Sequence, residues 1–287
     1  MTTATHPGAS SPATPTPSSW QWFRSASPAL ALAGVAFLVT SALLLVPIAL
    51  DGRQWQGAST WLKPWKFHFS LAVQLLTFAL LAHAIAPEAR RRIGTRAWIA
   101  VAVATSVFEA AYITLMGALN QGSHFNVATP GAAMMYTLMG VGAVLLSMSG
   151  AALGVQIARF PHPRISPALR WGVALALVLG WLVGTTTGAY MGGQVNHWVG
   201  GGPMSDAGGL PLFGWSRSGG DLRVAHFAGV HATQSIALVA WWLQRRAQTP
   251  RQMHRALLRT AAFGALWVVL TALLFVQATG GRPLLAG

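Results

Sequence analysis

Side chains that can do chemistry gather where a Gly-rich segment runs into an apolar one. Residues 219–234 read Gly-Gly-Asp-Leu-Arg-Val-Ala-His-Phe-Ala-Gly-Val-His-Ala-Thr-Gln. Asp221 is suited to cap a helix here, because a carboxylate accepts hydrogen bonds from the free amides of the first turn. At about 100° per residue, His226 and His231 point roughly 140° apart on that helix. We therefore expect the two histidines to serve different neighbours and not to bind one metal ion together.

A carboxylate also lies in the middle of an apolar stretch, at Glu109. Burying such a group in a membrane is costly, so it is a functional hypothesis by default. Tyr112 and Asn120 fall on the same helical face, and that face leads to His124 in the next loop. We expect Glu109 and Tyr112 to handle protons, with His124 nearby.

Two lysines form a third set, at the start of another apolar segment. Lys63 and Lys66 belong to the sequence Lys-Pro-Trp-Lys-Phe, and Lys66, Ser70 and Gln74 follow one another at four-residue steps on one helical face. The lysines could bind an anionic head group or substrate together with Arg223, or pair with one of the few acids. The simpler alternative is that both lysines extend toward lipid head groups.

Every one of these residues has a structural alternative, because a lone His, Ser or Gln in a membrane helix most often makes an interhelical hydrogen bond. The candidate site comprises the catalytic residues Glu109 and Tyr112, the substrate-binding residues Lys63, Lys66, Asp221, Arg223 and Gln234, and the metal ligands His124, His226 and His231.

The elements that must position these residues are membrane helices. The 287 residues are 53% hydrophobic and only 8% charged, and long apolar runs recur along the whole chain. The sequence predicts an all-α, polytopic transmembrane bundle over residues 29–287, preceded by a disordered tail over residues 1–28 that is rich in Thr, Ser, Pro and Ala. The seven predicted spans cover residues 29–50, 66–86, 97–119, 132–158, 171–192, 226–243 and 260–279.

The basic residues set the expected orientation. Of the 19 Lys and Arg residues, 13 lie in the tail and in alternate loops (87–96, 159–170 and 244–259), and six lie on the opposite side. The positive-inside rule then places the N-terminus in the cytoplasm and the C-terminus outside a bacterial plasma membrane. The net charge of +14 therefore indicates membrane topology and not nucleic-acid binding. The candidate residues cluster on the outer side.

Glycines recur every fourth residue in the fifth predicted span, at Gly180, Gly184, Gly188 and Gly192. Small residues at this spacing let two helix backbones approach closely. The favoured interpretation is packing within the chain, and the alternative is a homodimer through this face.

The motifs Lys63-Pro64-Trp65-Lys66-Phe67, Ser123-His124-Phe125-Asn126 and the 219–234 segment together resemble those of an uncharacterised family of bacterial multi-pass membrane proteins. That resemblance implies no activity. At fold level only, histidines at helix ends beside a Gly-rich outer loop are similar to heme-bearing bundles such as heme A synthase and b-type cytochromes.

Three functions stay open at this point. The first is a heme- or metal-linked redox or binding role, with imidazole ligands oriented by Gln234 or Asp221. The second is a proton-coupled transporter or receptor for a small solute, with Lys63, Lys66 and Arg223 gathering charge if that solute is an anion. The third is a structural or assembly factor whose polar groups only lock the bundle together. No cysteine is present, so neither a disulfide nor a thiolate ligand contributes to any of them.

Overall fold

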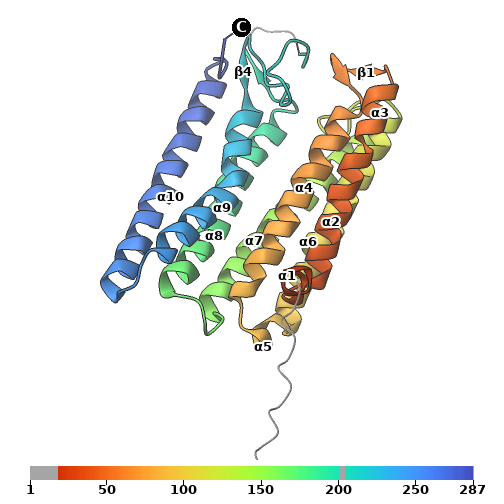
Figure 1. The fold of residues 1–287 in the computed structure, drawn as a ribbon. Coiled ribbons are helices and arrows are strands. Elements are labelled where there is room, and N and C mark those ends of the chain that lie inside the picture. Colours follow the sequence, from red (N-terminus) through yellow and green to blue (C-terminus); the bar gives the residue numbers. More distant parts are fainter. Residues whose placement is uncertain (1–18, 201–203, 287) are drawn as a thin grey trace, which may run out of the picture.

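Long apolar helices, running lengthwise beside one another, make up most of the computed structural model (Figure 1), which describes residues 19–200 and 204–286. The long helices are α2 (Pro28–Leu43), α4 (Leu62–Leu81), α6 (Ile93–Ala118), α7 (Pro130–Arg159), α8 (Pro167–Gly193), α9 (Leu222–Arg245) and α10 (Pro250–Thr279). The short ones are α1 (Ser19–Ser25), α3 (Leu45–Leu50), α5 (Pro87–Arg90) and the 3-10 turn η1 (Ala82–Ala84).

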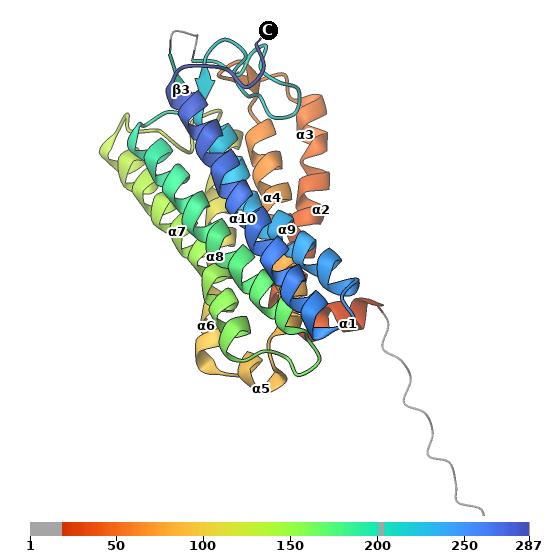
Figure 2. The ribbon, with the colours of Figure 1, turned by 90° about the vertical axis from the view of Figure 1, so that its left-hand side faces the viewer.

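Two small hairpins cap one end of the bundle. Strand β1 (Gln54–Trp55) pairs antiparallel with β2 (Ala58–Ser59), and β3 (Trp198–Val199) pairs antiparallel with β4 (Gly220–Asp221). Both hairpins and the long loop between β3 and β4 lie at the same end, whereas α5 and the connection between α9 and α10 lie at the opposite end (Figures 1 and 2). The irregular structure that surrounds the candidate residues is therefore at the hairpin end.

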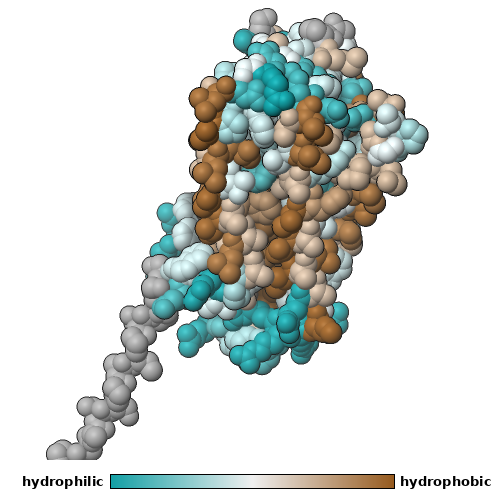
Figure 3. Space-filling view, turned by 90° about the vertical axis from the view of Figure 1, so that its right-hand side faces the viewer, coloured by the Kyte–Doolittle hydropathy of each residue, from teal (hydrophilic) through white to brown (hydrophobic). Residues whose placement is uncertain are grey.

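Within the described residues, six helical segments are long and apolar enough to cross a membrane: Pro28–Leu50, Leu62–Ala84, Ile93–Ala118, Pro130–Arg159, Pro167–Gly193 and Pro250–Thr279. The chain is a helical membrane protein by this criterion, and one face shows apolar side chains across its middle and hydrophilic ones at both ends (Figure 3). The predicted span over residues 226–243 lies in α9, which is long enough but is not among the six. Its two histidines and Gln234 lower the mean hydropathy of this helix.

The helix boundaries follow from caps and prolines. Ser27, Thr129, Ser166 and Thr249 each accept an amide hydrogen bond at the start of a helix, and a proline occupies the first position of each of these helices. The capping box at Thr249 starts α10 ten residues before the predicted span, so most of the basic loop 244–259 is helical. The predicted disordered tail is wrong for Ser19–Ser25, which form α1, and residues 1–18 of that tail lie outside the described residues.

The glycine stripe of α8 packs against α9 within the chain. A Cβ at Gly184 would lie 2.8 Å from Val230 Cγ1, one at Gly188 would lie 2.8 Å from His226 Cε1, and one at Gly180 would overlap Thr233 Oγ1. A homodimer through these three glycines would therefore have to displace α9. Gly192, one turn further along, lies beside Tyr136.

Candidate functional site

Glu109, the single acid of α6, is buried, with 4% of its side chain exposed. It lies about 2.5 turns from the hairpin end of the helix, and its carboxylate points at α7. The facing residue is Gly142, where a Cβ would come within 2.7 Å of Glu109 Oε1. Among the described residues, Oε1 has no hydrogen-bond partner. A carboxylate oxygen in this state can still accept a hydrogen bond or hold a proton.

His124 lies next to Glu109. Its Nε2 is 3.9 Å from Glu109 Oε2, which is too long for a hydrogen bond, and its Nδ1 is 3.2 Å from Ser123 Oγ. The ring is packed among aromatic side chains, with centroid distances of 5.4 Å to Phe67 and 6.4 Å to Tyr136. Burial, and then the charges of Lys63 and His226, lowers the pKa of His124 well below its usual value. His124 is thus a neutral imidazole at neutral pH.

Lys63 is brought to the same place by the close approach of α4 and α6. A Cβ at Gly117 would lie 2.7 Å from Pro64 Cγ, and Thr60 Oγ1 donates a 2.7 Å hydrogen bond to the Gly117 carbonyl. The Lys63 ammonium group lies 6.0 Å from the centre of the Phe67 ring, the same ring that contacts His124. Within the described part of the chain Lys63 has no ion-pair partner. Because Lys63 and His124 share the Phe67 ring and His124 lies beside Glu109, we treat the three side chains as one cluster. Its polar groups can still accept or donate hydrogen bonds or form an ion pair.

Lys66 and the rest of its helical face do not join this cluster. Lys66 Nζ donates to the Phe213 carbonyl at 3.0 Å, which ties α4 to the loop between β3 and β4. Ser70 is exposed, so the helical face that carries Lys66, Ser70 and Gln74 does not point into the bundle at that position. Gln74 Oε1 accepts a 3.0 Å hydrogen bond from Gln234 Nε2, the interhelical contact that was the structural alternative for these side chains.

Asp221, Arg223 and Asp206 form an ion-pair network, called the knot below, that fixes the long loop to the bundle. Asp221 caps α9 as predicted, by accepting from the Arg223 amide, and its other oxygen accepts from the Ser216 amide at 3.0 Å. The Arg223 guanidinium is shared between Asp221 at 2.7 Å and Asp206 at 2.8 Å, and it also donates to the Gly214 carbonyl. The polar groups of Asp221 and Arg223, both predicted to bind substrate, therefore make their hydrogen bonds and ion pairs within the protein.

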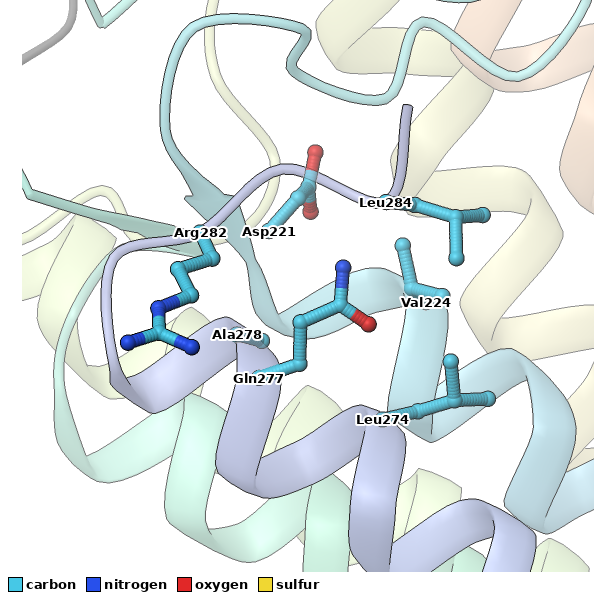
Figure 4. Close-up of a pocket in the computed structure, with 7 residues that line it drawn as sticks. All are labelled: Asp221, Val224, Leu274, Gln277, Ala278, Arg282 and Leu284. Carbon is cyan, nitrogen blue, oxygen red and sulfur yellow. The ribbon is translucent and has the colours of Figure 1, made fainter. Parts of the chain in front are cut away.

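A depression beside this knot offers no binding space. It is lined by Asp221, Val224, Leu274, Gln277, Ala278, Arg282 and Leu284 and is too small to hold a water molecule (Figure 4). The segment after α10 covers it, and Gln277 Nε2 donates to the Pro283 carbonyl at 2.6 Å.

His197 belongs to the knot and was not among the predicted residues. Its Nδ1 lies 3.4 Å from Asp221 Oδ1, and its ring lies 3.8 Å from that of Trp198 and 5.8 Å from that of Phe125. Burial lowers the pKa of His197. Although burial alone would raise the pKa of Asp221, contacts from His197 and Arg223 hold it well below its usual range. The available signal was a histidine close to the glycine run 200–202, on the side where the other candidates cluster.

The two histidines of α9 have different neighbours, as the helical spacing predicts. His226 Nδ1 lies 3.0 Å from the Gly184 carbonyl on α8 and 3.5 Å from Thr187 Oγ1. The His231 ring packs against Phe227 at 4.1 Å between centroids. Tyr112 lies one turn from Glu109 on α6.

The described side chains do not form a ligand set of the kind that a metal site needs. Across residues 19–200 and 204–286, no three His, Asp or Glu side chains lie together as a metal ion would require. His124 and His231 face aromatic rings, and His226 Nδ1 is held by α8. Within the described residues no three such side chains therefore form a shared metal site, and a metal or heme role for His124, His226 and His231 stays a prediction.

Comparison with known proteins adds no relative, since no family model, curated protein or solved structure matches this chain.

Proposed function

We propose that this is a multi-pass protein of the plasma membrane in which α9 is a seventh span, with the N-terminus in the cytoplasm and the C-terminus outside. The distribution of 13 basic residues against six supports this orientation. A seventh span is supported by the place of α9 between α8 and α10, where it runs the length of the bundle (Figure 2). In this orientation the hairpin end, with Lys63, His124 and Glu109, faces outward.

The function we propose is the binding of a small anion at this cluster, coupled to the movement of one proton on Glu109. The observation that carries the proposal is that Glu109 Oε1 is buried and, within the described residues, unpartnered next to two other groups with unused polar capacity. A buried polar group without a partner costs free energy, so the unpartnered Glu109 Oε1 favours a ligand that completes its hydrogen bonding.

The roles follow from the chemistry of the three side chains. Lys63 supplies the positive charge for the anion, since no acid of the described residues lies within ion-pair distance of it. His124, which stays neutral, supplies a hydrogen bond to the anion from Nε2, while its Nδ1 faces Ser123 Oγ. Glu109 donates a hydrogen bond when protonated and repels the anion when ionised, which makes proton uptake and anion binding favour one another.

The test is anion binding to the purified protein, with proton uptake measured in the same samples. Acetate, lactate, phosphate and nitrate would be titrated separately while a pH-indicator dye reports protons taken up per anion bound. We expect at least one anion to bind, with uptake of close to one proton at a pH where Glu109 is ionised before the anion binds and with little uptake where it is already protonated. Lys63→Gln should weaken that binding about tenfold or more, the loss of one buried charge pairing. Glu109→Gln should abolish the proton uptake.

Two matched variants serve as controls. Glu88 is exposed on α5 at the opposite end, and Arg217 is exposed on the long loop, so Glu88→Gln and Arg217→Gln remove the same charges elsewhere. Both should bind and take up protons like the unmodified protein. Failure of all four anions to bind, or unchanged proton uptake in Glu109→Gln, would reject the proposal.

A further inference from the structure

Two tryptophans and two arginines meet at the end of α9 that is opposite the candidate site. Trp241, Trp242, Arg245 and Arg246 line a hollow of ≈ 310 Å³ at this end. Trp241 is 43% exposed and Trp242 49% exposed, and both arginines are exposed as well. Large apolar side chains left open at the end of a membrane helix lie where lipid head groups meet the acyl chains.

Each arginine is stacked on one of the indole rings. The Arg245 guanidinium carbon lies 4.7 Å from the Trp241 ring centroid, and that of Arg246 lies 3.9 Å from the Trp242 centroid. Stacking uses the flat face of a guanidinium and leaves its N–H edges free to bind a phosphate or carboxylate in bidentate fashion. The rings therefore hold two fork-shaped donors in place without consuming their hydrogen bonds.

These two charges have no counter-charge within the part of the chain that the structure describes. Among the described residues neither arginine makes an ion pair, and none of the five acids in the sequence lies on α9 after Asp221 or on α10. Arg245, in the last turn of α9, is stabilised by the helix dipole, but this interaction does not neutralise its positive charge. A complementary group must come from outside the chain.

We propose that this hollow binds the phosphate head group of an anionic phospholipid. The indole rings would lie against the glycerol and upper acyl chain, while Arg245 and Arg246 bind the phosphate oxygens. The site is separate from the Glu109 cluster, and it serves whichever leaflet faces this end of the bundle. A free phosphate carries the negative charge that the arginines would bind, but it has no apolar part to contact the indole rings.

The first test is lipid retention by the full-length protein, measured by native mass spectrometry after exchange into detergent with equal amounts of phosphatidylglycerol and phosphatidylcholine. We expect roughly tenfold preferential retention of phosphatidylglycerol, as two interfacial arginines allow. The double variant Arg245→Gln/Arg246→Gln should lose this preference. The matched control Arg91→Gln/Arg96→Gln removes two exposed arginines at the same end and should keep it.

A second measurement needs no change at the arginines. Brominated phosphatidylglycerol should quench the tryptophan fluorescence of the unmodified protein more than brominated phosphatidylcholine does. That excess should vanish in Trp241→Phe/Trp242→Phe. Equal retention by the arginine variant and the control, or an excess of quenching that survives the tryptophan changes, would overturn the proposal. Displacement of the lipid by millimolar inorganic phosphate would also overturn it in favour of a free-phosphate site.

Discussion

The carboxylate of Glu109 lies against α7 at a position where the facing residue has no side chain. A Cβ at Gly142 would approach Glu109 Oε1 to 2.7 Å, closer than real contacts allow. We expect Gly142→Ala to push the carboxylate away from its place beside His124. Overpacking of this kind costs about 1–3 kcal/mol, at the lower end here because the clash is with the end of a side chain. Thermal unfolding in detergent and titration with the anion that binds would measure both effects.

Gly140 provides the control on the same helix, because no described atom lies within 4 Å of a Cβ built there. Gly140→Ala should leave both the unfolding temperature and the affinity unchanged or slightly raised, since alanine favours a helix more than glycine does. If Gly142→Ala behaves like Gly140→Ala, the Glu109 carboxylate does not lie against α7 at Gly142.

His197 gives the knot around Asp221 a predictable dependence on pH. Its pKa is lowered in the folded protein, so the unfolded chain takes up a proton first as the pH falls. The stability that His197 contributes is present above its unfolded pKa of about 6.5 and is lost as the pH falls below it. The charged groups that act on it are Asp221, Arg223 and Asp206. Unfolding temperatures at pH 8 and pH 5.5 should differ less in His197→Gln than in the unmodified protein, and an identical difference would contradict this origin.

At the scale of elements, α8 and α9 pack closely because glycines on α8 leave room for the backbone of α9. A Cβ at Gly180 would lie 3.0 Å from the backbone nitrogen of Thr233, and one at Gly229 would lie 3.1 Å from the Gly184 backbone. Backbone cannot rotate away as a side chain can. We expect Gly180→Ala to separate the two helices and to cost about 3 kcal/mol despite the better helix propensity of alanine. Chemical denaturation in mixed micelles would measure the loss.

Gly193, at the end of the same helix, is the matched position, because no described atom lies within 4 Å of a Cβ placed there. Gly193→Ala should cost little or nothing. A fall in oligomer size without loss of stability in Gly180→Ala would instead support a homodimer through the glycine stripe, in place of the packing of α9 on this face.

The elements themselves were largely predictable, and the exceptions have identifiable causes. Apolar runs of about 20 residues located every long helix, because length and hydropathy are local properties of the chain. The start of α10 was not predicted because Thr249, Pro250 and Gln252 set it, a local capping signal that hydropathy does not report. Which face of a helix is buried was less predictable: Ser70 shares a face with Lys66 by spacing and yet is exposed.

At the scale of the molecule, the candidate residues separate into groups that sequence spacing could not assign. His124 and Glu109 come together from a loop and α6, whereas Arg223 turns to Asp206, which is 17 residues away in the loop. Such partners depend on how loops fold back over the bundle. Charge counts alone predict a polar end that faces outward, whereas separating the Glu109 cluster from the ion-pair network around Asp221 depends on distances that only the structure gives.

The orientation of the whole chain is the prediction on which the outward site depends, and the lack of cysteine makes it direct to test. Ser218 lies at the hairpin end before α9, and both Gln248 after α9 and Arg91 after α5 lie at the other end; all three are exposed. We expect a membrane-impermeant maleimide to label Ser218→Cys in intact cells, and Gln248→Cys and Arg91→Cys only after permeabilisation. Labelling of Ser218→Cys and Gln248→Cys from the same side would mean that α9 does not cross, and the reverse pattern would turn the Lys63, His124 and Glu109 cluster toward the cytoplasm.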